Sequence, residues 1–321
     1  MRPRSSSRRR GARALACPDS LKGVLSAPEA ASALADGLRT WADEVRTLPV
    51  ADGGEGTLVV LHVALGGEWQ DVEVHDAFGR RRRARWLALP DGIACVESAE
   101  AIPLDPSRLD PFAASSRGLG ELIRAVGACR SLLVCLGGTA NVDGGAGLLE
   151  LVDVLPAPTR VACDVDVPLG DAARVFASQK GATPADALAL EVRLLSMGKL
   201  REFADVPGAG AAGGLGAALA SLGAELVPGA ALVLDTIGFD PAGYDVVVTG
   251  EGMVDATTMR GKAPGEVVRR CVQAGVRCVL FGGRVVEAPL DVETVALSGD
   301  PRRVREDLVE LGRQANFGNV T

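Results

Sequence analysis

The sequence has 321 residues, a formal net charge of -7 and a hydrophobic fraction of 47%. This length is enough for two domains of ordinary size, and the hydrophobic fraction excludes an intrinsically disordered chain. The acidic balance argues against nucleic acid as the main partner, and no apolar run reaches the length that spans a membrane. Forty glycines accompany an aromatic content of only 3%, which predicts an aliphatic core and many tight backbone loops.

Seven cysteines and two histidines further limit the chemistry. The number of cysteines is odd and no CxxC pair occurs, so we expect reduced thiols and a cytoplasmic location. His62 and His75 fall in an apolar helix and an alternating strand, which argues against a histidine-dependent triad and favours carboxylates and lysines. Residues 1–11 are basic and lack the apolar segment of a signal peptide, so we interpret them as a disordered tail.

The first elements alternate between strand and helix. Ser26 and Glu29 form a capping-box pattern at the start of the first helix, with Pro28 in its first turn. Such a β-α-β-α order is typical of a parallel sheet. The expected strands are residues 12–18 and 46–50, and the expected helices are 29–44 and 55–65.

The middle of the chain changes pattern. Residues 68–76 and 82–89 alternate with period two around a turn at Gly79, which predicts an antiparallel hairpin with one solvated face. Further strands are expected at 92–98, 131–138, 160–165, 244–250, 277–283 and 294–299. Further helices are expected at 117–127, from about 145, at 184–204, 214–222 and 264–274, and from Asp300.

These elements predict an α/β fold in two domains. Both ends of the chain, 12–65 and 240–321, would form one discontinuous domain, because parallel-sheet patterns occur in both. Residues 66–239 would form an inserted domain in which strands and helices are mixed.

Two acidic, glycine-bearing segments follow the first two strands. CPDSLKG, at 17–23, presents Asp19, Ser20 and Lys22 at the carboxyl end of a strand, where open α/β sheets bind ligands. VADGGEG, at 50–56, places carboxylates beside glycines, a combination that can hold Mg²⁺ while the backbone approaches a phosphate. The alternatives are a solvated polar loop and an acidic helix start.

Three longer glycine-rich segments follow. LGGTANVDGGAG, at 136–147, leads from a strand into a helix and predicts an anion site. PGAGAAGGLG, at 207–216, matches the dinucleotide pattern G-x-G-x-x-G, but no strand precedes it, so we reject that reading and keep a loop-to-helix anion site. TGEGMVDATTMRGKAPG, at 249–265, is not a P-loop, because Ala256 and Ala263 replace its Gly and Ser/Thr.

Two smaller features complete the set. Ser116 and Arg117 stand at a helix start and could bind a carboxylate or phosphate, and Asp164 ends a strand before Lys180. Strand ends that carry Asp and Gly, with scattered Lys and Arg, favour phosphoryl transfer, in which the protein mainly positions groups and offsets charge.

Together the segments CPDSLKG, PVADGGEGT, SSRGLGELI, GGTANVDGGAG, VACDVDVPLG, SQKGA, DVPGAGAAGGLGAAL and VVTGEGMVDATTMRGKAP resemble the type I (bacterial) glycerate kinase family. They occur in family order over about residues 17–283. The resemblance implies ATP-dependent phosphorylation of D-glycerate with Mg²⁺, with 2-phosphoglycerate favoured over 3-phosphoglycerate. It also implies that the discontinuous domain is a Rossmann/flavodoxin-like parallel-sheet domain.

On this hypothesis, each predicted site residue receives a role. The catalytic residues are Asp164, Asp19 and Lys22, with Asp164 or Asp19 as the base. The substrate-binding residues are Ser20, Ser116, Arg117 and Lys180. The nucleotide-binding residues are Gly137, Gly138, Thr139, Gly144, Gly145, Gly213, Gly214, Glu251 and Lys262. The Mg²⁺ ligands come from Asp52, Asp143 and Asp255.

Three positions depart from the family pattern: Val142 and Val167 replace asparagines, and Thr257 replaces a glutamine. They leave open a non-catalytic paralogue that binds glycerate or nucleotide, and a kinase for another small hydroxy acid. A dinucleotide-dependent oxidoreductase ranks last. We expect no nucleic-acid or membrane partner, and the sequence leaves room for a homodimer.

Overall fold

The computed structural model describes residues 11–316, which fall into two compact units. Unit 1 consists of the chain up to Pro49 together with Phe239–Met259 and the chain from Pro264 onward, and unit 2 consists of Val50–Gly238 and Arg260–Ala263. The predicted tail lies outside the described residues except for Gly11.

The first boundary lies earlier than the expected one at residue 65. The helix α2 (Thr57–Leu65) contacts β4, β5 and α9, all in unit 2, and buries Leu58 and Leu61 there. The apolar surface of α2 therefore packs against elements of unit 2, and the helix belongs to that unit.

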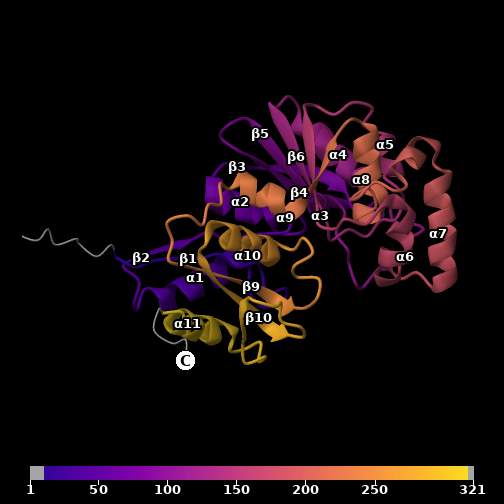
Figure 1. Ribbon diagram of the computed structural model, residues 1–321. Coiled ribbons are helices and arrows are strands. Elements are labelled where there is room, and N and C mark those ends of the chain that lie inside the picture. The colour runs from indigo at the N-terminus through magenta and orange to yellow at the C-terminus, as the bar shows by residue number, and fades with distance from the viewer. Residues whose placement is uncertain (1–10, 317–321) are drawn as a thin grey trace, which may run out of the picture. The chain divides into compact units, whose positions relative to one another are not determined.

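Unit 1 is built on a five-stranded parallel sheet in the order β11-β10-β9-β1-β2, whose central strands lie side by side in Figure 1. Its strands are β1 (Arg13–Ala16), β2 (Glu44–Thr47), β9 (Val246–Val254), β10 (Arg277–Val285) and β11 (Glu293–Ala296). Its helices are α1 (Ala27–Leu38), α10 (Ala263–Ala274) and α11 (Val304–Gln314). The parallel sheet and the mixed sheet of unit 2 confirm the predicted α/β fold class.

Helices cover both faces of the unit 1 sheet, as parallel sheets require. Leu34 of α1 and Leu308 of α11 pack with Val246 and Phe281, whereas Val268 of α10 packs with Leu280 on the opposite face. The predicted capping box at Ser26 starts α1.

Unit 2 contains a six-stranded mixed sheet in the order β3-β4-β5-β6-β7-β8. β3 and β4 form the predicted antiparallel hairpin, β4 pairs antiparallel with β5, and the strands from β5 to β8 run parallel. The strands are β3 (Glu68–His75), β4 (Arg81–Ala88), β5 (Ile93–Glu97), β6 (Ser131–Leu136), β7 (Thr159–Cys163) and β8 (Glu225–Pro228).

The remaining helices of unit 2 flank this sheet. α4 contacts β3, β4 and β5, and α8 contacts β6, β7 and β8. Leu122 of α4 and Leu219 of α8 belong to the same apolar cluster. Besides α2, the helices are α3 (Ser98–Ala101), α4 (Arg117–Val126), α5 (Ala146–Leu149), α6 (Ala172–Phe176), α7 (Pro184–Ser196), α8 (Ala211–Ser221) and α9 (Gly229–Thr236). Three short 3₁₀ turns are η1 (Leu169–Asp171), η2 (Ser178–Lys180) and η3 (Gly198–Phe203).

Two expected helices end earlier than predicted: the first ends at Leu38 and not at residue 44, and the second is the helix expected at 184–204. The pattern at 184–204 breaks at Met197, whose backbone is extended at φ -74° and ψ 93°, and continues only as η3. Gly198 follows directly and weakens helical continuation. The core is aliphatic as expected, and within residues 11–316 no helix is both long and apolar enough to cross a membrane.

Candidate active site

The carboxyl ends of the parallel strands of unit 2 meet at one edge of its sheet. Leu136 at the end of β6 pairs with Cys163 at the end of β7, and Cys163 pairs with Pro228 at the end of β8. Gly137 and Asp164 therefore leave neighbouring strands at the same edge, the position at which open α/β sheets bind ligands.

The loop at 50–56 brings a second carboxylate to this edge. A methyl group on Gly54 would lie 3.2 Å from Asp52 Oδ1 and 3.5 Å from Asp164 Oδ2, so both carboxylates border the same glycine. A methyl group on Gly137 would lie 2.7 Å from Asp164 Oδ2 and 2.8 Å from Gly54 Cα. Glycine at both positions thus lets two loops and two carboxylates approach each other.

Exposed backbone continues this edge at Gly138. Its φ of +64° is in the region that favours glycine, and a methyl group there would lie 3.1 Å from Glu55 Oε2. Thr139, the next residue, is 2% exposed and lies within reach of Lys180. The predicted residues Asp52, Gly137, Gly138, Thr139, Asp164 and Lys180 all belong to this region of unit 2.

Lys180 is a buried cation, with only 3% of its surface exposed. Its Nζ donates to the backbone oxygen of Asn141 at 2.7 Å and to Thr139 Oγ1 at 3.5 Å. Burial lowers the pKa of Lys180 to about 8, although the charges of Asp164 and Asp143 act in the opposite direction. Lys180 therefore supports the loop after β6 from within the protein.

Asp143 lies in a saturated hydrogen-bond network. Its Oδ2 accepts from the backbone and hydroxyl of Ser116, at 2.8 and 2.7 Å, and from Gly147 N at 3.2 Å. Its Oδ1 accepts from Asn141 Nδ2 at 2.9 Å and from Gly145 N at 3.0 Å. With 3% exposure, this carboxylate joins the start of α4 to the glycine loop before α5.

The predicted nucleotide-binding glycines Gly144, Gly145, Gly213 and Gly214 are buried where two loops pack together. Gly144 N donates to Gly213 O at 3.1 Å, and a methyl group on Gly213 would lie 2.2 Å from Asn141 O. A methyl group on Gly145 would lie 2.3 Å from Ala218 Cβ. These glycines permit close contact between the segments 136–147 and 207–216.

Glu97 and Ser98 were missed by the sequence reasoning. Glu97 ends β5 with 5% exposure and accepts from Gly56 N at 2.9 Å and Leu58 N at 3.2 Å. Burial raises its pKa to about 7, whereas the two backbone N–H groups act to lower it. An acidic residue at the end of a buried strand, as in IACVES, was the available signal.

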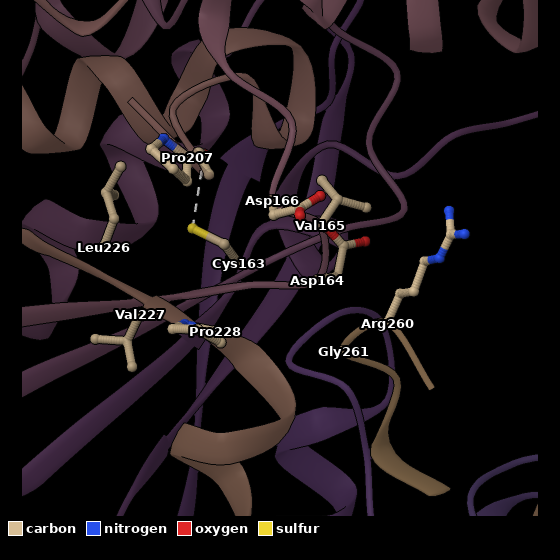
Figure 2. Close-up of a pocket in the computed structure, with 11 residues that line it drawn as sticks. Cys163, Asp164, Val165, Asp166, Pro207, Leu226, Val227, Pro228, Arg260 and Gly261 are labelled. Atoms are coloured by element: carbon tan, nitrogen blue, oxygen red, sulfur yellow. Dashed lines mark hydrogen bonds between the residues drawn. The ribbon is translucent and has the colours of Figure 1, made fainter. Parts of the chain in front are cut away.

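A pocket of about 140 Å³ lies beside Asp164, and Figure 2 shows the residues that line it. Asp164, Asp166 and Arg260 lie toward one side, and Cys163 Sγ points toward the Gly208 backbone, to which it is hydrogen-bonded at 3.6 Å. The opposite wall is apolar and consists of Pro207, Leu226, Val227 and Pro228. Sequence reasoning assigned no role to these wall residues or to Arg260.

Arg117 and Ser116 are placed differently from the expectation of a ligand-facing pair. Arg117 is exposed and pairs with Glu150 at 3.0 Å and with Glu121 at 3.5 Å. Ser116 is fully buried against Asp143.

The remaining predicted residues of unit 1 lie after β1 and in or just after β9. Asp19 N donates to Gly250 O at 2.9 Å, which joins the segment after β1 to the neighbouring strand β9. Lys22 is exposed, and Ser20 N donates to Asp19 Oδ1 at 2.5 Å. Glu251 Oε1 accepts from Thr258 at 2.8 Å. Asp255 also lies in unit 1, whereas Lys262 is assigned to unit 2.

The three departures from the family pattern are accommodated. Val142 is fully buried in an apolar cluster with Leu169 and Leu194, where an amide would lack polar partners. Thr257 donates its backbone N–H at 2.8 Å and its hydroxyl at 2.5 Å to Asp255 Oδ1. The backbone oxygen of Val167 accepts from Gly210 at 2.9 Å, a bond that any side chain allows.

Comparison with known proteins decides the family. A sequence model of one protein family, described as the glycerate kinase family, matches residues 14–155 and 153–299. The chain belongs to the glycerate kinase family. A glycerate kinase of Halalkalibacterium halodurans is 35% identical over 318 residues, covering 83% of this chain and 84% of that protein.

Two further relatives support this assignment. Glycerate 2-kinase of Escherichia coli is 35% identical over 77% of this chain and 78% of its own length. A crystal structure from Salmonella typhimurium LT2, described as a candidate glycerate kinase 2, matches with a TM-score of 0.79 and 31% identity, covering 95% of this chain and 97% of that one. The predicted family, fold class and kinase enzyme class are confirmed.

Proposed function

We propose that this protein transfers the γ-phosphoryl group of ATP to a hydroxyl of D-glycerate and forms 2-phosphoglycerate. The observation that carries the proposal is the pair of carboxylates, Asp52 and Asp164, that both border Gly54 in a member of the glycerate kinase family. Phosphoryl transfer needs a base for the acceptor hydroxyl and a carboxylate near the phosphates, and the pair offers both.

Asp164 is the proposed base. Its carboxylate accepts the proton of the glycerate hydroxyl as the hydroxyl oxygen bonds to the γ-phosphorus, and the bond from that phosphorus to the bridging oxygen of ADP breaks. Such proton transfer contributes about 10²–10⁴-fold to a rate. Lys180 offsets negative charge near Asp164 and holds the loop through Asn141.

Asp52 is the proposed ligand for Mg²⁺. Mg²⁺ neutralises charge on the nucleotide phosphates and is held by one or two carboxylates together with phosphate oxygens. Residues 11–316 contain no cluster of three or more His, Cys, Asp or Glu that would hold a metal by itself, so the phosphates would have to supply the other ligands. The five hydrogen bonds of Asp143 count against its predicted role as a ligand.

The apolar pocket is assigned to the base of the nucleotide. Glycerate is a three-carbon acid with two hydroxyls and has no apolar group to fill the wall formed by Leu226 and Pro228. An aromatic base gains about 25 cal/mol for each Å² of apolar surface that it buries there. Roles for Asp19, Ser20, Lys22, Glu251 and Lys262 stay predictions, as do a role for Asp255 in metal binding, a homodimer and a cytoplasmic location.

The proposal is tested by coupling ADP release to NADH oxidation with D-glycerate, ATP and Mg²⁺. We expect saturable turnover, and phosphorus NMR of the product should show 2-phosphoglycerate. Absence of turnover by folded protein that still binds glycerate or nucleotide would establish the non-catalytic alternative. A panel of small hydroxy acids at fixed ATP tests the other alternative, in which glycerate is not the preferred acceptor.

A further inference from the structure

Glu97 caps a helix to which it does not belong. The N-cap residue of α2 is Gly56, which has no side chain to receive the first N–H groups of that helix. Glu97, at the end of β5, accepts from Gly56 N and Leu58 N instead. A carboxylate at this position is also favoured by the helix dipole.

This cap lies next to the loop that carries Asp52. Only three residues separate Asp52 from Gly56, and Thr57 Oγ1 donates to Gly54 O at 2.7 Å. Gly54 is the residue that both carboxylates of the proposed site border. Movement at the start of α2 would therefore be transmitted directly to Asp52.

Ser98, the next residue after Glu97, holds the opposite loop. Its hydroxyl is fully buried and lies 3.2 Å from both Gly137 O and Gly137 N. Gly137 in turn packs against Gly54 and Asp164. The end of β5 thus contacts both loops that border the carboxylate pair, one through Glu97 and the other through Ser98.

We propose that Glu97 is a positioning residue for phosphoryl transfer, which anchors the loop at 50–56 so that Asp52 stays beside Asp164. The inference rests on the proposed function, because only that function gives the carboxylate pair a reaction to perform. Glu97 acts through the backbone of Gly56 and Leu58 and does not itself touch the substrate.

The test compares E97A, E97Q and the control S26A in the full chain. E97A removes both acceptor oxygens, whereas E97Q keeps one. S26A removes the side-chain cap of α1 in unit 1 and matches the loss of a helix cap, which costs about 1 kcal/mol, outside the proposed site. Rates are measured at a temperature at which circular dichroism shows every variant folded, and amide hydrogen exchange is followed in parallel.

We expect kcat to fall about 100-fold in E97A, because a displacement near 1 Å costs a factor of that order. E97Q should be intermediate, S26A should stay within twofold of wild type, and KM for glycerate should change less than threefold in all three. Amides of residues 50–58 should exchange at least about tenfold faster in E97A but not in S26A.

Two results would overturn the inference: an unchanged kcat in E97A, or an equal loss in S26A. If wild-type protein does not phosphorylate glycerate, the proposed function fails. The hydrogen-exchange data then test independently whether Glu97 anchors the loop at 50–56. Faster exchange confined to residues 50–58 then supports the role of Glu97 in anchoring the loop, and unchanged exchange refutes it.

Discussion

The ammonium of Lys180 lies 2.7 Å from the backbone oxygen of Asn141, and both side chains are almost fully buried. This contact links η2 to the loop after β6, which also carries Gly137 and Asp143. A buried cation is costly unless nearby negative charge compensates it. The carboxylates of Asp164 and Asp143 supply that compensation, so Lys180 couples the proposed base to the fold of unit 2.

Deprotonation of Lys180 should lower the rate of the reaction at alkaline pH. Its pKa of about 8 means that the charged form prevails below pH 8, so kcat should fall as the pH rises through that value. K180M should lose about 100-fold in kcat and lack this limb, and K180R should move the limb to higher pH. A pH–rate profile measures both effects, and an identical limb in K180M would contradict the assignment.

The same pKa predicts the sign of a stability effect. Burial depresses the pKa of Lys180 in the folded state below its ordinary value of 10.5. The contribution of Lys180 to stability is therefore full above pH 10.5 and is lost as the pH falls through about 8. The free energy of unfolding of K180M relative to wild type should therefore shift in favour of K180M between pH 10 and pH 7. Urea denaturation at several pH values measures the difference.

D164N should lower kcat by about 10²–10⁴-fold, because an amide cannot accept the proton of the glycerate hydroxyl. The KM for ATP should change less than kcat, although Asp164 also borders the pocket assigned to the nucleotide base. D91N is the matched control, since Asp91 is exposed in the turn between β4 and β5. Steady-state kinetics test the prediction, and a near-normal rate for D164N would remove Asp164 as the base.

D143N should act on stability more than on metal binding. Its amide presents a donor where Ser116 and Gly147 require an acceptor, and such buried unsatisfied groups cost about 1–3 kcal/mol each. We expect a lower Tm and an unchanged Mg²⁺ dependence of the remaining activity. A raised Mg²⁺ requirement with unchanged Tm would instead restore Asp143 as a metal ligand.

G213A should be more destabilising than G223A. Both glycines have positive φ, +69° and +89°, which costs an alanine about 1–2 kcal/mol. Only at Gly213 would the methyl group also meet backbone, at 2.2 Å from Asn141 O, whereas nothing lies within 4 Å at Gly223. Urea midpoints compare the two variants, and equal losses would show that the contact between the two glycine loops is adaptable.

L226D should change the KM for ATP without changing the KM for glycerate. A carboxylate in the apolar wall of the pocket should raise the KM for ATP at least about tenfold, because the base would lose an apolar contact and meet a desolvated charge. The KM for glycerate should stay near the wild-type value. L188D, on an exposed part of α7, is the control. A selective effect on glycerate would assign the pocket to the acid.

Local signals in the sequence identified much of the fold. The capping box at Ser26, the period-two hairpin around Gly79 and the apolar strands β7 and β9 each depend on neighbours within a few residues. The same local order of strand, glycine and acid indicated Asp52 and Asp164. The motifs in their order indicated the glycerate kinase family, which the comparisons confirm.

The use of each polar residue depended on contacts that are distant in sequence. Asp143 resembled a metal ligand, but Ser116 from 27 residues away takes part of its hydrogen-bonding capacity. The sequence predicts Lys180 as a substrate-binding residue, but its ammonium is buried against the backbone of Asn141, and burial lowers its pKa. Glu97 had no motif, and its bonds to Gly56 and Leu58 cross 41 and 39 residues. Sequence order determined which residues reach the sheet edge. Packing decided the role that each carboxylate there can take, because burial and hydrogen bonding depend on tertiary neighbours.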